Sequence, residues 1–456
     1  MSDFREFGHK LIDWVADYLE SSERFPVLST LQPNDIIDGL PAHGPEQGES
    51  LDRIFDDFER VILPGITHWN HPRFLAFFAN TSSPPAVLAE LLAAALNANG
   101  ILWKTSPAVT ELEVVTLRWL LHWLGLPQDW FGMILDTAST STLHAIAAAR
   151  VAMAPETREL GAPNDLVLYT SDQAHSSVEK GAMALGFGRA NVRSIGSDAE
   201  FRMRPDLLEE AILRDREAGL RPCCVVATVG TTSTTSIDPV PAIADIAQRE
   251  GLWLHVDAAY AGSAAVVPEF GWILGGCERA DSLVFNPHKW LMVPVDCSVL
   301  YCRHPDVLRQ AFSLVPDILR TTDGGLNMMD YGIPLGRRFR ALKLWFVLRY
   351  YGHEGLAAII REQVAMTKRL KERIAADPRF EICAPSELSV ICFRQRGSDE
   401  MNRLLLDGVN GSGRFFISST VVHGRYILRI AVGNIQTSRA TLDELWSLMD
   451  ALAVVA

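Results

Sequence analysis

Residues 252–290, LWLHVDAAYAGSAAVVPEFGWILGGCERADSLVFNPHKW, contain two apolar runs that each lead into a charged residue. The first run, residues 252–257, ends in Asp257, and the second, residues 281–286, is followed by Lys289. One helix-length connection separates them, so we expect neighbouring or near-neighbouring strands whose ends share one rim of a sheet. An ion pair is the commoner explanation for a lone aspartate and lysine. Buried ion pairs rarely recover their desolvation cost, however, so this pair at strand ends among small residues favours a functional site.

The same alternation of strand and helix patterns extends over residues 84–342. Further runs of strand length lie at residues 132–135, 165–170 and 223–230, and helical patterns lie at residues 142–154 and 204–219. Strands that alternate with helices predict an α/β fold, in which a mainly parallel sheet is covered by helices on both faces. Ligands of such sheets bind beyond the carboxyl ends of the strands.

The regions on either side have other patterns. Residues 1–83 form a predicted N-terminal helical arm, whose first helix carries an apolar stripe that fits either a core helix or a helix packing on a partner subunit. Residues 24–50 are rich in proline, glycine and acidic residues and predict an extended segment. Residues 303–330 predict a loop-rich lid. After a helical pattern at 340–352, strand-like runs near 388–395, 413–420 and 426–433 predict a smaller α+β domain over residues 343–456.

Composition excludes several classes of partner. The net charge of −13, without any basic block, argues against nucleic-acid binding. The longest apolar candidate, residues 84–103, contains Glu90 and begins with two prolines, so no membrane span is expected. The N-terminus lacks the order of a signal peptide, and the seven cysteines lack disulfide spacing. We therefore expect reduced thiols and a cytoplasmic protein.

Two further segments supply polar groups at strand ends. Residues 137–142 are a run of hydroxyl-bearing and small residues between a strand and a helix start, which suits a phosphate but is also ordinary helix capping. His175 follows the run at 165–170, where its ring could stack on a flat cofactor. A phosphate cradle, an aspartate and a lysine are together what pyridoxal phosphate requires. No Walker or dinucleotide-binding glycine motif is present.

Four segments carry a resemblance to a known family. TSDQAHSSVEK (170–180), HVDAAYAG (255–262), NPHKW (286–290) and IPLGRRFRALKLWF (333–346) resemble the pyridoxal-phosphate decarboxylases of the aromatic-L-amino-acid decarboxylase family, a group II family. The resemblance covers nearly the whole chain. NPHKW is shared with related glutamate, histidine and cysteine-sulfinate enzymes, whereas THWNHP (67–72) and the His175 segment favour the aromatic branch. The resemblance implies a fold-type I transferase fold with a seven-stranded sheet in the large domain, in a homodimer whose active sites lie at the subunit interface.

The resemblance also implies roles for individual residues. Lys289 is similar to the lysine that forms a Schiff base with the cofactor, Asp257 to the partner of the pyridine nitrogen, and His175 to the histidine stacked on the ring. The remaining cofactor positions are Ala259 against the other ring face, Ala138 and Ser139 at the phosphate, Asn286 and His288 completing that shell, and Thr232 in the cofactor site.

The implied substrate pocket is less certain in composition. Trp69, Phe77 and Phe78 resemble its aromatic wall, completed in the family by the partner chain, although their pattern alone fits plain core. At three further positions, Asn80, Ile101 and Gly336, the sequence departs from the residues common in the family, so tryptophan, phenylalanine, tyrosine and dopa cannot be ranked.

The mobile loop departs from the family at Ile318, where a tyrosine is usual. That tyrosine is thought to reprotonate the substrate carbon, and isoleucine has no proton to give, so water, His175 or Tyr331 would have to replace it. In the family, loss of the tyrosine is associated with aldehyde synthesis, in which decarboxylation is coupled to oxidative deamination. We expect a decarboxylase of aromatic amino acids. An aldehyde synthase, a decarboxylase of glutamate or histidine, and an inactive binding homologue remain alternatives.

Two further groups have residue types that are typical of binding sites. His68 and His71 form an HxxH pattern without a third ligand at metal spacing, so no metal site is expected. Arg429 fits either a contact with a substrate carboxylate or a structural ion pair.

Overall fold

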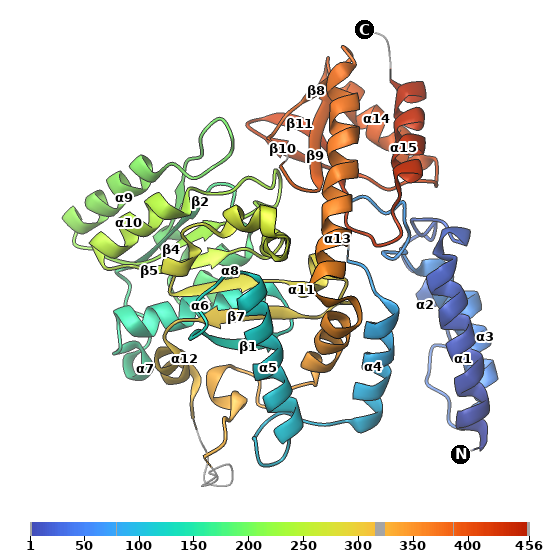
Figure 1. Cartoon of the computed structure of the whole chain (residues 1–456), viewed down its shortest axis with the longest axis horizontal. Coiled ribbons are helices and arrows are strands. Elements are labelled where there is room, and N and C mark those ends of the chain that lie inside the picture. The colour runs from blue at the N-terminus through green and yellow to red at the C-terminus, as the bar shows by residue number, and fades with distance from the viewer. Residues whose placement is uncertain (1, 79, 315–323, 386, 454–456) are drawn as a thin grey trace.

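The structure is a computed structural model that describes residues 2–78, 80–314, 324–385 and 387–453 (Figure 1). Its larger sheet has seven strands in the order β1-β7-β6-β5-β4-β2-β3. The strands are β1 (Phe131–Leu135), β2 (Leu166–Ser171), β3 (Val192–Ile195), β4 (Arg221–Thr228), β5 (Trp253–Asp257), β6 (Ser282–Phe285) and β7 (Ser298–Cys302). β6, β5, β4, β2 and β3 run parallel, and β7 lies antiparallel between β6 and β1. The predicted fold class, a mainly parallel seven-stranded sheet, is confirmed.

Helices cover both faces of this sheet, because each central strand is apolar on both sides. Val225 and Ala227 of β4 join the hydrophobic cluster that includes α9 (Pro205–Glu217) and α10 (Val240–Glu250). The alternate residues, Cys224 and Val226, join the cluster under α6 (Ala138–Met153) and α8 (Ser177–Ala184). A near-continuous apolar run such as 223–229 is what a strand buried on both faces requires. The short helices α7 (Thr157–Leu160), α11 (Pro287–Trp290) and α12 (Pro305–Phe312) complete this part of the chain.

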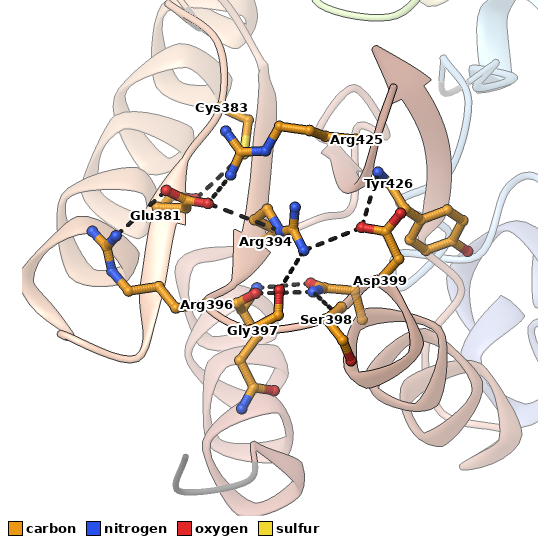
Figure 2. Close-up of polar contacts among 11 residues, drawn as sticks. Glu381, Cys383, Arg394, Arg396, Gly397, Ser398, Asp399, Arg425 and Tyr426 are labelled. Atoms are coloured by element: carbon orange, nitrogen blue, oxygen red, sulfur yellow. Dashed lines mark hydrogen bonds and ion pairs between the residues drawn. The ribbon is translucent and has the colours of Figure 1, made fainter. Parts of the chain in front are cut away.

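The smaller sheet is antiparallel, in the order β10-β11-β9-β8. Its strands are β8 (Phe380–Ile382), β9 (Val390–Gln395), β10 (Ser418–Val422) and β11 (Arg425–Ala431), covered by α14 (Asp399–Gly411) and α15 (Arg439–Leu452). A close-up of this region shows Arg394 of β9 between the carboxylates of Glu381 and Asp399 (Figure 2). The smaller antiparallel sheet agrees with the predicted α+β pattern.

The long helix α13 (Arg340–Ala376) connects the two sheets, and Figure 1 shows it running from the large domain into the small one. The backbone leaves helical geometry at Gly352, whose φ is 65°. α13 packs on α4 (Pro84–Leu96) and α5 (Pro107–Trp123). The expected division at 83/84 and 342/343 stays a prediction, and its second boundary falls inside α13.

The N-terminal segment contains α1 (Ser2–Glu20), α2 (Asp35–Gly39) and α3 (Leu51–Asp57). It then crosses to the small sheet, where the Leu75 N–H donates to Phe416 O at 2.8 Å and the Ala431 N–H donates to Leu75 O at 2.8 Å. This chain path brings Phe77 and Phe78 towards the junction of the two sheets.

Several sequence expectations need correction. The segment 24–50 was expected to be extended, but it contains α2, and the loop-rich stretch 303–330 begins with α12. β3, β7 and β8 were not predicted: β3 and β8 have only four and three residues, whereas β7 has five residues, like β1, and its pattern was overlooked. Within the described parts of the chain, no helix is long and apolar enough to cross a membrane.

Candidate active site

One cavity of about 170 Å³ lies at the carboxyl ends of the parallel strands. Asp257 ends β5, and Lys289 stands in α11 directly after β6, the neighbouring strand in the sheet. Thr137 and Ala138 reach the cavity from the turn between β1 and α6. The structure thus brings together all nine residues predicted for the cofactor: Ala138, Ser139, His175, Thr232, Asp257, Ala259, Asn286, His288 and Lys289.

The start of α6 offers hydrogen-bond donors to this cavity. The first backbone N–H groups of a helix have no partner within it and carry its positive dipole end. Thr137, the residue before α6, makes no side-chain cap, and its hydroxyl instead lies 3.4 Å from that of Thr140. Ala138 and Ser139 line the cavity at this end. An uncapped helix start is suited to bind a phosphate.

Lys289 is buried beside an aromatic ring, an arginine and a carboxylate. Its Nζ lies 4.9 Å from the centre of the Phe78 ring, and Arg429 packs on the same ring at 5.3 Å. Burial lowers the pKa of Lys289; Asp257 opposes that shift and Arg429 reinforces it. A lysine whose pKa is lowered keeps more of its amine neutral, and the neutral amine is the nucleophile.

The hydrogen bonds of two histidines fix which ring nitrogen carries the proton. The Cys297 N–H donates to His288 Nδ1 at 2.9 Å, and the Ser177 N–H donates to His175 Nδ1 at 3.1 Å. Because both Nδ1 atoms accept, the proton of each neutral ring is on Nε2. Burial lowers the pKa of His288 to about 4, so this ring is neutral at neutral pH.

Unpartnered polar atoms in the cavity wall test whether a polar cofactor fits. Thr228 Oγ1 and Asn286 Oδ1 are buried and have no hydrogen-bond partner among the described residues. Asp257 lies beside Thr228 in the strand register and accepts one backbone bond, from Ala259 N–H at 3.0 Å. Buried polar atoms are rarely left unpaired. A small anionic ligand that also needs a carboxylate and an amine therefore fits this wall.

The sequence prediction missed part of the wall. The structure adds Ser177, Thr228, Gly230 and Tyr260, and it places Thr137, the first residue of the 137–142 run expected to suit a phosphate, in the same wall. Ser177 follows His175 by two residues and bonds its ring, at 2.8 Å from Oγ to Nδ1, so the spacing within AHSS was the available signal. Tyr260, in AAYAG, stacks on Phe78 with ring centres 4.1 Å apart.

The predicted substrate residues are more scattered. Phe78 lines the cavity, whereas Trp69 and Phe77 stack on each other outside it, with ring centres 5.9 Å apart. Asn80 follows on the same segment, and its buried Oδ1 has no hydrogen-bond partner among the residues that the structure describes. Of the remaining three positions, Ile318 lies outside the described residues.

Ile101 and Gly336 lie on two segments that are bonded to each other. The Gly100 N–H donates to Arg337 O at 2.9 Å, and the Arg337 N–H donates to Asn99 Oδ1 at 2.9 Å. Neither Ile101 nor Gly336 lines the cavity of the single chain. Their place in a substrate pocket stays a prediction.

Arg429 makes no ion pair with the described residues. Its Nε donates to Ser233 O at 2.7 Å, and its Nη1 donates to Phe77 O at 3.2 Å and Ser418 Oγ at 3.3 Å. Its Nη2 is buried without a partner among the described residues. Because no carboxylate among the described residues neutralises Arg429, its positive charge is available to an anion in the neighbouring cavity.

Comparison with known proteins decides the family. The family model described as the pyridoxal-dependent decarboxylase conserved domain matches residues 33–396. The chain belongs to this decarboxylase family. Pyridoxal phosphate is accordingly its cofactor, and the enzyme is a carboxy-lyase.

Relatives of this decarboxylase include enzymes with different products. It is 42% identical to aromatic-L-amino-acid decarboxylase from Bos taurus, over 99% of this chain and 96% of that protein. It is 41% identical to phenylacetaldehyde synthase from Arabidopsis thaliana, over 98% of this chain and 94% of that protein. The crystal structure of Oryza sativa TDC with PLP and tryptamine is 38% identical and superposes with a TM-score of 0.97, over 99% of this chain and 98% of that one.

No group of three or more potential metal ligands occurs within the described residues. The histidines of the HxxH pattern have other partners: His68 Nδ1 lies 3.0 Å from the Tyr18 hydroxyl, and His71 Nδ1 accepts from Arg73 N–H at 3.0 Å.

Proposed function

We propose that this enzyme removes the carboxylate of an aromatic L-amino acid to give the corresponding arylalkylamine and carbon dioxide. The observation that carries the proposal is the meeting of Lys289, Asp257 and the start of α6 at one cavity. Relatives named for aromatic amino acids, at about 40% identity over the whole chain, support the substrate class.

The residues of the cavity would each take one part of the cofactor. Lys289 would hold it covalently through its amine, and Asp257 would pair with its ring nitrogen. The α6 amides at Ala138 and Ser139 and the Nε2–H of His288 would bind its phosphate. Bound in this way, pyridoxal phosphate supplies an electron sink for the pair of electrons left when carbon dioxide departs.

The other roles belong to the protein groups around the substrate. His175 and Ala259 would hold the cofactor ring from its two faces, and the Nε2–H of His175 would be available as a proton source. Arg429 would orient the substrate carboxylate through its unpartnered Nη2. Trp69, Phe77, Asn80, Ile101 and Gly336 would complete the aromatic pocket from this chain and its partner.

A homodimer is part of the proposal. The four most exposed leucines of α4 form one stripe along the helix, Leu88, Leu91, Leu92 and Leu96. An apolar stripe of this kind marks a surface that another protein covers. A second copy would cover it and bring its own aromatic residues towards Phe77. The seven free cysteines support a reducing, cytoplasmic location.

A second candidate is an aromatic aldehyde synthase. Ile318 carries no ionisable proton, and the identity to a phenylacetaldehyde synthase, 41%, is close to the identity to decarboxylases. If the substrate carbon were not reprotonated promptly, oxygen could take two electrons from it and become hydrogen peroxide, and hydrolysis of the resulting imine would release the aldehyde and ammonia.

Product analysis separates the two candidates. The purified enzyme with pyridoxal phosphate would be incubated with tryptophan, phenylalanine, tyrosine and dopa in turn, and with glutamate and histidine for comparison. Carbon dioxide, amine, aldehyde and hydrogen peroxide would be measured together. Amine without peroxide is the expected result. Aldehyde with equimolar peroxide would favour the synthase, and turnover of glutamate or histidine alone would contradict the aromatic assignment.

A further inference from the structure

His255 lies on β5 two residues before Asp257, so both side chains project from the same face of the sheet. This is the face that α6 covers. His255 is completely buried, and the proposed reaction gives it no role. Each of its ring nitrogens still needs a hydrogen-bond partner, because buried polar atoms are rarely left unpaired.

The contacts of Ser282 on β6 locate the ring proton of His255. The indole N–H of Trp253 donates to Ser282 Oγ at 2.9 Å, and His255 Nδ1 lies 2.9 Å from the same oxygen. The hydroxyl has one proton to give, and His255 Nδ1 is its only acceptor among the described residues. Nδ1 therefore accepts, and Nε2 carries the proton of the neutral ring.

That Nε2–H has no hydrogen-bond partner within the described part of the chain. Buried waters commonly satisfy such groups when two to four polar atoms surround them. Two buried hydroxyls in the same layer also lack partners: Thr228 Oγ1, beside Asp257 in the strand register, and Thr142 Oγ1 on α6. These unpartnered polar atoms all lie between α6 and the face of the sheet from which Asp257 projects.

Asp257 is within electrostatic reach of the imidazole. Burial lowers the pKa of His255 to about 4, and the Asp257 carboxylate opposes that shift. One carboxylate oxygen, Oδ1, already accepts from Ala259 N–H. A second donor from behind would fix the plane of the carboxylate and favour its charged form.

We propose that His255 is a positioning residue for Asp257: its Nε2–H donates a hydrogen bond to one buried water, and that water donates to the carboxylate, so that the ionised carboxylate stays oriented towards the cofactor. The inference rests on the proposed function, because it assumes that Asp257 pairs with the cofactor nitrogen. Trp253 and Ser282 serve in turn to hold the imidazole in the tautomer that the contact needs.

Two amide substitutions separate this role from a structural one. In His255→Asn the amide takes the place of Nδ1, which keeps the Ser282 bond but loses the donor at Nε2. In His255→Gln the amide reaches the place of Nε2, which keeps that donor but loses the Ser282 bond. A residue that only supports Ser282 and Trp253 would tolerate asparagine and not glutamine, whereas the positioning role predicts the opposite order.

The readouts are the dissociation constant of pyridoxal phosphate from the apoenzyme and the pH at which the visible absorption of the holoenzyme changes. We expect His255→Asn to weaken cofactor binding by about 10-fold or more, in the range of losses seen when a supporting residue is removed. The same variant should move the spectral transition to lower pH. The dissociation constant of His255→Gln should stay within about 3-fold of the parent value, because this variant keeps a donor at the place of Nε2. Val226→Ala, at the register partner of His255 on β4, is the matched control for the loss of buried packing. It should leave the pH of the spectral transition unchanged.

Three results would overturn the inference: glutamine and asparagine equally harmful, both harmless, or asparagine the better tolerated. An Asp257→Ala variant in the same experiment distinguishes a failure of the proposed function from a failure of the role given to His255. If Asp257→Ala binds the cofactor normally, the proposed function itself fails. If Asp257→Ala loses the cofactor and His255→Asn does not, only the role of His255 fails.

Discussion

At the scale of single residues, the chemistry depends on charges that the fold holds apart from water. Lys289 and Asp257 line one cavity, and Arg429 packs on Phe78 in the wall of that cavity without a carboxylate partner among the described residues. The strand ends at Asp257 and Lys289 were the strongest sequence signal, because a charged residue after an apolar run is costly unless it has a function.

Replacing Asp257 tests the charge that faces the cofactor nitrogen. Asp257→Ala should lower the rate of amine formation by about 100-fold or more, as expected when a charge that stabilises the transition state is removed. Cofactor affinity, measured by titrating the apoenzyme, should fall as well. Asp257→Glu, which keeps the charge, is the control and should retain more activity than alanine. An alanine variant with parental rate would contradict the assignment.

Lys289, Asp257, His175 and the turn at 137–142 could be singled out from the sequence because they lie at strand ends with recognisable local patterns. The remaining cofactor positions, Thr232, Ala259, Asn286 and His288, came only from the resemblance to the family. The substrate residues could not be tested in the same way. Trp69 and Phe77 stack on each other outside the cavity, and Ile318 lies outside the described residues. A pocket shared between two chains leaves no continuous pattern in one sequence, so its composition rests on the resemblance.

At the scale of elements, the alternating patterns predicted most parallel strands but not the antiparallel β7. β7 is inserted between β1 and β6, and only the complete sheet shows this order. Further along α6, a buried histidine ties this helix to the segment before α13, which its sequence did not reveal. His144 of α6 accepts the Ile333 N–H at Nε2, 3.1 Å away, and its Nδ1–H donates to Thr140 O at 2.7 Å.

His144 should make the enzyme sensitive to acid. Burial lowers its pKa to about 4 in the folded chain, against 6.5 when exposed, so only the unfolded chain gains a proton between those values. Its contribution to stability is complete above pH 6.5 and is lost as the pH falls towards 4. From pH 7.5 to 5 the loss is about 2 kcal/mol for this one group.

His144→Gln, which cannot titrate, should therefore show a smaller drop in thermal midpoint between pH 7.5 and 5 than the parent enzyme. Nearby Arg337 and Asp136 are present in both proteins and cancel in the comparison. An identical drop in both proteins would contradict the buried, neutral state of His144.

The small sheet offers a test of its polar cluster. The Arg394 side chain is only 7% exposed, bonds Gly397 O at 2.8 Å and pairs with Asp399 at 3.2 Å (Figure 2). Arg394→Met should reduce stability by about 1–3 kcal/mol, because it leaves partly buried acceptors without a charged donor. Arg396→Met is the control, because the Arg396 side chain is 59% exposed and pairs with Glu381, which also contacts Arg394. This variant should reduce the free energy of unfolding by less than about 0.5 kcal/mol. Urea unfolding followed by circular dichroism measures both, and equal losses would contradict the distinction.

At the scale of the whole molecule, the two sheets meet around the cavity, and the exposed leucines of α4 point to a second chain. The Ser233 region of the large domain bonds Arg429 of the small sheet, so the site depends on both parts of the chain. Local sequence patterns describe each part separately and do not predict how they meet.

A charge on the α4 stripe tests the dimer. Leu91→Glu should shift the mass in solution from dimer to monomer and reduce amine formation, because each substrate pocket would lose the residues of its partner. Leu213→Glu on α9 is the control, because Leu213 is 49% exposed and Leu91 is 51% exposed. It should leave the mass in solution and the rate of amine formation unchanged. Light scattering during gel filtration measures the mass. A dimeric Leu91→Glu enzyme would show that α4 is not the interface.

The central claim is that Lys289 holds the cofactor, and one measurement tests it directly. The holoenzyme would be reduced with borohydride, which makes a lysine–cofactor bond permanent, and the modified peptide identified by mass spectrometry. We expect one pyridoxyl group, on Lys289, and none in Lys289→Ala. A group on another lysine of the parent enzyme, or a reduced adduct that persists in Lys289→Ala, would contradict it.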